Sequence, residues 1–198
     1  MPVDAKTIKD LREATGAAVM DCKSALETAD GNFQKAIELL RKKGIAKAEK
    51  KAGRLTVEGR IGSYIHSNGK IGAIVELNCE TDFVAKNQEF LDLLHDLCLQ
   101  IVGANPESIS KDDLPKDLVE REKALYEEEV KGKPADIAAK ILEGKLAKNL
   151  YSQRCLLHQN FINEAKFEGT VSDMIKGKIG KLGENITVRR FVRFEVGG

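Results

Sequence analysis

The spacing of apolar residues changes from helical to alternating near residue 57, and this change limits the chain to folds that combine helices with a sheet. Before it, apolar residues recur every three or four positions, as on one face of a helix. After it, residues 60–66 and 71–78 are β-rich runs separated by Asn68-Gly69, a pair typical of a hairpin turn. A mixed α and β structure is therefore expected.

Residues 4–43 are predicted to form three short helices. Asp4 is suited to cap the first helix, which Gly16 ends, and Asn32 to cap the third, which Gly44 ends. A unit of this size buries little apolar surface alone. We interpret it as a compact binding module on a tether.

The rest of the chain is predicted to be an α+β core. A third strand is expected over 186–196, where apolar residues alternate with Arg and Glu. Three strands with helices inserted between the second and third predict a mostly antiparallel sheet. Helices are expected over 88–103, 114–130, 135–150 and 171–182. The expected domains are a docking module at 1–43, a basic linker at 44–56, helical and exposed, and the core at 57–198.

The charge balance gives no sign of a nucleic-acid partner. Lys and Arg total 32 against 31 Asp and Glu, whereas proteins held by phosphate charge usually have a strongly basic face. Residues 41–54 are locally basic, and a solvated helix or linker and a ribosome or nucleic-acid contact are both open there.

No run approaches the roughly 20 apolar residues that span a bilayer. Residues 1–10 lack the apolar stretch of a signal peptide. A cytoplasmic protein is expected.

Motifs for catalysis or cofactor binding are missing from the sequence. It has no P-loop, no G-x-G-x-x-G before a helix and no G-x-S-x-G elbow. Its histidines are scattered, and none of its four cysteines forms a C-x-x-C pair. Cys98, within an apolar run, is expected to be a core residue, and Cys155 with His158 would supply only two metal ligands. We expect no enzyme, no cofactor and no metal site.

The segment 81–87, T-D-F-V-A-K-N, follows a strand and precedes a helix, so Phe83 is expected near a connecting tip. Two interpretations are open from the residues alone. The phenylalanine packs under the start of the helix, which Asp82 caps, or it is an apolar wedge presented to a partner, as single aromatic side chains often are in interfaces.

Three motifs resemble those of the elongation factor Ts family. They are C-E-T-D-F-V-A-K-N at 79–87, L-R-E-A-T-G-A-x-x-M-D-C-K-S-A-L at 11–26 and G-E-N-I-T-V-R-R at 183–190. They stand in the family's order, and the resemblance covers essentially the whole chain. It implies a nucleotide exchange factor that binds elongation factor Tu, both GDP-bound and nucleotide-free, and releases GDP without a catalytic site or cofactor of its own.

The resemblance also implies the residues that contact the partner. The first three helices resemble a ubiquitin-associated-type module. The chain departs from many relatives at two of the contact positions. Val19 of the module stands where they have methionine, and Leu182 of the core replaces a commoner isoleucine. One group presses on the partner beside its Mg²⁺ and phosphate site: Thr81, Asp82, Phe83 and Val84. The helical module contributes Arg12, Val19, Met20 and Lys23. Weaker contacts from the core are His66, Leu182 and Gly183.

The chain departs from longer relatives, which have two core modules. With strands for only one sheet, it resembles the compact form of the family, whose members resemble homodimers, and a lone three-stranded sheet leaves a face to cover. We expect a homodimer from a bacterial cytoplasm or an organelle of bacterial descent, without direct nucleic-acid or membrane binding. The alternative is a non-catalytic adapter that binds protein or RNA through the three-helix module.

Overall fold

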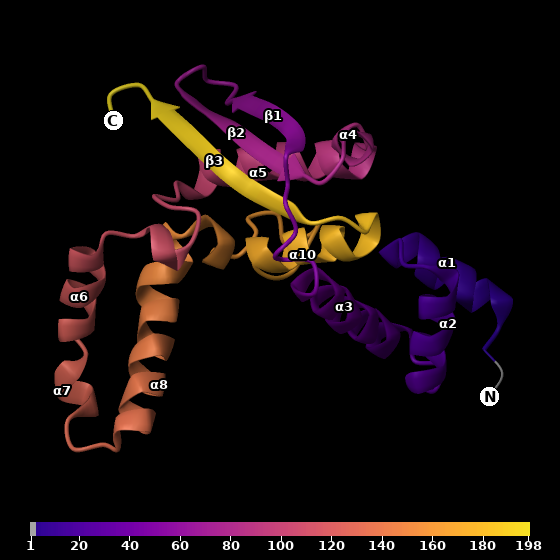
Figure 1. Ribbon diagram of the computed structural model, residues 1–198, viewed down its shortest axis with the longest axis horizontal. Coiled ribbons are helices and arrows are strands. Elements are labelled where there is room, and N and C mark those ends of the chain that lie inside the picture. Colours follow the sequence, from indigo (N-terminus) through magenta and orange to yellow (C-terminus); the bar gives the residue numbers. More distant parts are fainter. Residues whose placement is uncertain (1–2) are drawn as a thin grey trace. The chain divides into compact units, whose positions relative to one another are not determined.

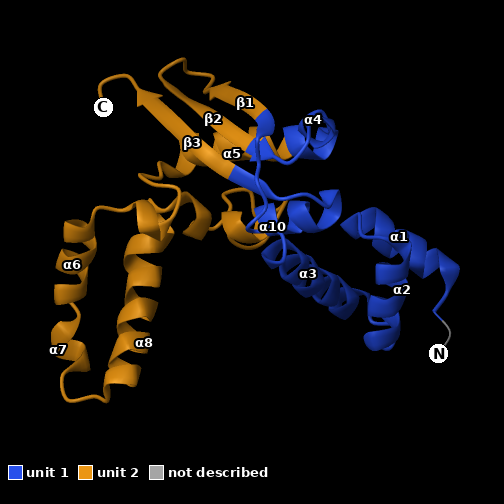
Figure 2. Ribbon diagram, viewed as in Figure 1, with its two compact units in different colours: residues 1–59, 78–91, 175–187 blue, residues 60–77, 92–174, 188–198 orange. Residues whose placement is uncertain are grey.

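The computed structural model describes residues 3–198, so the first two residues of the predicted docking module lie outside the described residues. The chain divides into two compact units, which Figure 2 distinguishes by colour. The first unit comprises residues 1–59, 78–91 and 175–187, and the second comprises residues 60–77, 92–174 and 188–198. None of the helices described between residues 3 and 198 combines the length and the apolar composition that a bilayer-spanning helix needs.

The first unit begins with the three predicted helices, α1 (Ala5–Thr15), α2 (Val19–Thr28) and α3 (Phe33–Glu49). Gly16 ends α1 in the left-handed conformation at φ 66°, which glycine adopts without steric cost, and its N–H donates to the carbonyl of Arg12. The Asn32 side chain caps α3. Buried side chains of the three helices form one small core: Leu11, Cys22, Ala25, Leu26, Ala29, Ala36 and Leu40.

The third helix was predicted to end at Gly44, and this is wrong, because it continues to Glu49. The reason is packing against α10 (Val171–Leu182), the last helix of the chain. A Cβ on Gly180 would lie only 2.9 Å from the Gly44 Cα, so the two backbones approach where residue 180 has no side chain. The sequence pattern around Gly44 cannot predict a contact with a residue so distant in the chain.

The segment 44–56, expected to be exposed, is packed over part of its length. Ala48 is buried, and the ammonium group of Lys51 donates to the carbonyl oxygen of Gly183. Further on, the Thr56 hydroxyl lies 2.8 Å from that of Thr187. The basic segment therefore belongs to the first unit by contact as well as by sequence. Whether residues 1–43 and 57–198 fold independently stays a prediction.

The three strands form one sheet in the order β1-β2-β3, from β1 (Glu58–Ile65), β2 (Ile71–Cys79) and β3 (Ile186–Glu195) (Figure 1). β1 and β2 make the predicted hairpin, with Gly69 at φ 67° in its turn. β3 is antiparallel to β2, because the Val196 N–H donates to the carbonyl of Lys70 while Arg190 pairs with Glu76 farther along. The predicted α+β class is confirmed.

Helix α5 (Gln88–Ala104) covers one face of the sheet in the second unit (Figure 1). A Cβ on Gly62 of β1 would collide with the Leu94 side chain, and the Tyr64 ring meets His95 edge-on at 5.9 Å. On β2, the residues of this face are buried: Ala73, Val75 and Leu77. Residues that alternate with them point to the opposite face, since side chains alternate along a strand.

Helices inserted between β2 and β3 complete the second unit. The predicted helix over 114–130 is interrupted at Leu125 and Tyr126, giving α6 (Lys116–Ala124) and α7 (Glu127–Val130). These lie alongside α8 (Ala135–Leu146), as Figure 1 shows. A 3₁₀ turn, Lys111–Asp113, lies between α5 and α6. After α8 come the π-helical segment Ala147–Tyr151, α9 (Ser152–Arg154) and the 3₁₀ turn Leu156–His158, all before α10.

All four cysteines are free and buried. The prediction that Cys98 is a core residue is confirmed, since its side chain is fully enclosed. Burial raises the pKa of the Cys98 thiol to about 11, and burial also raises the pKa of Cys79 to about 11, with the nearby Glu184 carboxylate adding to the effect. Both thiols are therefore protonated, and weak as nucleophiles, at neutral pH.

Candidate partner-binding site

A single turn of helix directly after β2 presents an aromatic ring to solvent. This helix, α4 (Asp82–Ala85), buries Val84 and Ala85, whereas the Phe83 side chain is 80% exposed. The interpretation of Phe83 as a residue packed under the following helix is therefore wrong. The exposure of Phe83 indicates a binding role, because large aromatic side chains normally gain free energy from burial.

Asp82, beside Phe83, is half-exposed and forms an ion pair with Lys86 at 2.7 Å. The hydrogen bond from Lys86 lowers the pKa of the Asp82 carboxyl group, so this side chain is negatively charged at neutral pH. Asp82 is the first residue of α4, six positions before α5 begins at Gln88, so it does not cap the following helix as the packing interpretation predicts. The N-cap residue is Thr81, and its side chain makes no capping hydrogen bond to α4.

The turn after α10 lies next to α4. Leu182 is half-buried at the end of α10, and Gly183 follows at φ 81°, a left-handed conformation that favours glycine. The next residue, Glu184, accepts hydrogen bonds from Thr81. Residues from two sequence motifs about a hundred positions apart are thus neighbours in the first unit.

The predicted contact residues of the three-helix module are all at its surface. Met20 is 71% exposed and Val19 about half exposed, at the start of α2. Arg12 on α1 is exposed, and so is Lys23, which lies 3.8 Å from Glu27 on the same helix. The neighbours of these residues along both helices supply the core of the module, so its exposed side chains are free to contact another molecule.

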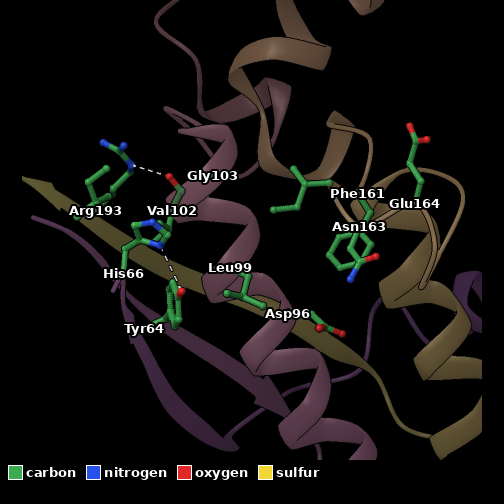
Figure 3. A pocket seen from close by; sticks show the side chains of 12 residues that line it. Tyr64, His66, Asp96, Leu99, Val102, Gly103, Phe161, Asn163, Glu164 and Arg193 are labelled. Carbon is green, nitrogen blue, oxygen red and sulfur yellow. Dashed lines mark hydrogen bonds between the residues drawn. The ribbon is translucent and has the colours of Figure 1, made fainter. Parts of the chain in front are cut away.

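The first unit therefore contains every predicted contact residue except His66. In the second unit, His66 follows β1, and its Nδ1 lies 3.3 Å from the Tyr64 hydroxyl. Both line an open cavity of about 640 Å³ with an apolar floor that includes Leu99 and Phe161 (Figure 3). Arg193 closes one side, its Nε donating to the Val102 carbonyl at 3.5 Å.

An ionic cluster joins the first turn of α5 to α10. Glu89, in the first turn of α5, accepts hydrogen bonds from Lys178 and from Lys181 of α10, the latter at 2.6 Å. Lys178 and then Lys181 lower the pKa of Glu89 to about 2. The cluster ties the start of α5 to the helix that carries Leu182.

The Glu89 cluster is expected to make the protein sensitive to acid. The unfolded chain protonates this carboxyl group near its ordinary pKa of 4.5 and the folded protein only near 2. Between these values the unfolded state binds more protons, so the free energy of unfolding falls as the pH falls. Glu89→Gln should lower the melting temperature at pH 7 and flatten its decrease between pH 4.5 and 2. An unchanged slope would contradict this role; Glu168→Gln, at an exposed carboxylate, is the control.

Within residues 3–198, no group of three or more His, Cys, Asp or Glu side chains is arranged to hold a metal ion. The candidate site consists instead of exposed apolar side chains beside charged ones. That combination is typical of a protein that binds another protein through a few anchor residues.

Comparisons with known proteins identify the family. The model of the family described as elongation factor TS matches residues 5–197. The chain is 51% identical over 199 residues to elongation factor Ts of Fervidobacterium nodosum, with 100% of both chains covered. It is 52% identical over 198 residues to that of Thermodesulfovibrio yellowstonii, covering 100% of this chain and 98% of the relative. The chain belongs to the elongation factor Ts family, as its three motifs predict.

Proposed function

We propose that this protein binds elongation factor Tu, in its GDP-bound and nucleotide-free states, and promotes release of GDP by disturbing the partner's Mg²⁺ and phosphate site. Membership of the elongation factor Ts family supports the choice of partner. The observation that carries the mechanism is the exposure of Phe83 beside the ionised Asp82 on α4. The proposal assigns no catalytic group to this chain.

The exposure of Phe83 is consistent with a ring that inserts into the partner as a wedge. A phenylalanine left in water forgoes about 1.5–3 kcal/mol of burial free energy, which becomes available when the ring enters a partner. Its neighbour Val84 is buried, so α4 is held from below while the ring projects outward. A ring held in this way can press on a partner without first being freed from a packed position.

Disturbing Mg²⁺ is sufficient to loosen GDP. The cation neutralises the phosphates, so moving it away exposes their mutual repulsion and removes part of what holds the nucleotide. The exchange factor supplies binding free energy to a conformer of elongation factor Tu that holds GDP poorly. By linkage, bound nucleotide weakens the grip of the factor on its partner by the same ratio. GTP, and then aminoacyl-tRNA, complete the cycle.

The three-helix module is proposed to dock like a ubiquitin-associated domain on the nucleotide-binding domain of the partner. Its exposed Met20 and Val19 supply apolar contact and Arg12 a charge. Leu182 and Gly183 add contacts beside α4. In this division of roles, the module holds the partner and α4 acts on the nucleotide site. The proposed location is the bacterial cytoplasm, with an organelle of bacterial descent as the alternative.

The test is release of labelled GDP from elongation factor Tu, with and without this protein at micromolar concentration. Acceleration that saturates with added protein supports exchange activity. Binding without acceleration would favour the adapter, which uses only the three-helix module. If the protein neither binds elongation factor Tu nor accelerates GDP release, elongation factor Tu is not its partner.

We also propose that two copies associate through the outer face of the sheet, because a lone three-stranded sheet leaves this face uncovered. This face, opposite α5 in the second unit, is rich in apolar side chains that are 41–71% exposed: Ile61, Ile65, Ile74, Val192 and Phe194. A charge pair, Arg190 with Glu76, lies on the same face at 2.6 Å. A second copy offers the same apolar surface, so a two-fold interface is self-complementary.

Phe194→Asp is expected to weaken this dimer by about tenfold or more, because a carboxylate would be buried without a partner. Sedimentation equilibrium measures the change, with the 21.8 kDa monomer mass as reference. Leu125→Asp, an exposed leucine between α6 and α7, is the matched control and should leave the mass unchanged. A wild-type protein that is monomeric at tens of micromolar would refute the proposal.

A further inference from the structure

We infer that Glu184 is a positioning residue, which holds the chain ahead of α4 so that Phe83 is presented in one orientation. The inference rests on the proposed function, because it concerns the same exchange site. Glu184 follows Gly183 in the turn after α10, and its side chain does not itself belong to α4. Its carboxylate contacts Glu80 and Thr81, which lie more than a hundred residues earlier in the sequence.

Three hydrogen-bond donors from Glu80 and Thr81, the two residues that precede α4, converge on this one carboxylate. Its Oε2 accepts hydrogen bonds from the backbone N–H of Glu80 at 3.1 Å and of Thr81 at 3.0 Å. Its Oε1 accepts one from the Thr81 hydroxyl at 2.6 Å. Hydrogen bonds to an ionised acceptor are stronger than neutral ones, and three of them fix both the position and the rotation of the segment.

The contact is reciprocal, so the turn is fixed as well as the segment it holds. The Glu80 carboxylate accepts a 2.6 Å hydrogen bond from the backbone N–H of Asn185. The Asn185 side chain is buried, and its amide group donates to the carbonyl of Arg54 at 2.9 Å. Segments that follow α3, β2 and α10 thus meet at residues 184 and 185.

Helix α4 needs such support at its start, in addition to the burial of Val84 and Ala85. It is a single turn, and isolated helical turns are unstable without tertiary contacts. Its N-cap, Thr81, makes no side-chain hydrogen bond into the helix; the hydroxyl is directed to Glu184 instead. The orientation of Phe83, two residues further on, therefore depends on the carboxylate that holds Thr81.

Hydrogen–deuterium exchange tests the positioning without the partner. In Glu184→Ala, the amides of Glu80 and Thr81 lose their acceptor and should exchange about tenfold faster or more. Glu184→Gln should restore much of the protection, because its carbonyl oxygen accepts from both amides and the Thr81 hydroxyl can accept from the new NH₂ group. Unchanged exchange at both amides in Glu184→Ala would overturn the inference.

GDP release supplies the second readout. Glu184→Ala is expected to lower the maximal release rate about tenfold, with a smaller change in the half-saturating concentration, because the docking module is intact. Glu184→Gln should recover the rate, and Glu168→Ala, at an exposed carboxylate, should leave it unchanged. Faster amide exchange with a wild-type maximal rate would show that the contact is structural only, and would also overturn the inference.

The two readouts separate this inference from the function on which it rests. A wild-type protein that leaves GDP release unchanged refutes the exchange function, whereas the amide exchange still decides whether Glu184 holds the segment. Should Glu184→Ala not fold, Glu184→Asp keeps the charge but is one methylene shorter, so it cannot reach all three donors. Its amides should exchange faster than those of Glu184→Gln, and equal protection would contradict the geometry.

Discussion

Phe83→Ala is expected to slow the saturating rate of GDP release from elongation factor Tu by about ten- to a hundred-fold, since truncating a buried interface aromatic costs roughly 2–4 kcal/mol. The affinity for the nucleotide-free partner should fall as well, because that is the conformer the wedge stabilises. The stability of the free protein should barely change, since the ring is 80% exposed. Stopped-flow release of a fluorescent GDP and a melting curve measure both effects.

The chain supplies a matched control for this experiment in Phe90 of α5, which is fully buried. Phe90→Ala should cost about 3–5 kcal/mol of folding stability, the usual price of a large cavity, while its folded fraction still releases GDP at the wild-type rate. The two substitutions remove the same side chain from opposite environments. A Phe83→Ala protein that is destabilised like Phe90→Ala, yet exchanges normally when folded, would refute the wedge.

The sequence predicts the elements of this protein because their patterns are local. Apolar spacing placed the helices near α1, α2, α5 and α10, and Asn68-Gly69 identified the hairpin that begins the sheet. Alternation over 186–196 identified β3, although its pairing with β2 joins residues far apart. Local pattern is enough where one face of an element is apolar and a turn residue marks its end.

Contacts distant in sequence explain what the pattern missed. Gly44 resembles a helix end, but α3 continues through it because α10 packs there at Gly180. The residues alone do not decide whether Phe83 is exposed, because a single turn of helix has no apolar periodicity; only the family resemblance favours exposure. Glu184 belongs to the motif at 183–190, yet nothing in the local sequence indicates that its carboxylate holds Thr81.

A substitution in the three-helix module should give the opposite kinetic result to Phe83→Ala. Met20→Asp is expected to raise the half-saturating concentration for GDP release about tenfold, equivalent to about 1.4 kcal/mol of binding free energy. The maximal rate should be unchanged, because α4 is intact and saturation overcomes weaker docking. Titration of the release rate to saturation separates the two quantities.

The stability of the module should tolerate this change. Met20 is 71% exposed at the second position of α2, where a negative charge interacts favourably with the helix N-terminus, and its neighbour Cys22 keeps the core contact. Gln34→Asp, on the exposed side of α3, is the control for added charge and should leave the titration unaltered. A Met20→Asp protein with wild-type half-saturation would show that α2 does not dock. One with a reduced maximal rate would show that docking by the module and release of the nucleotide are a single coupled step rather than two separable ones.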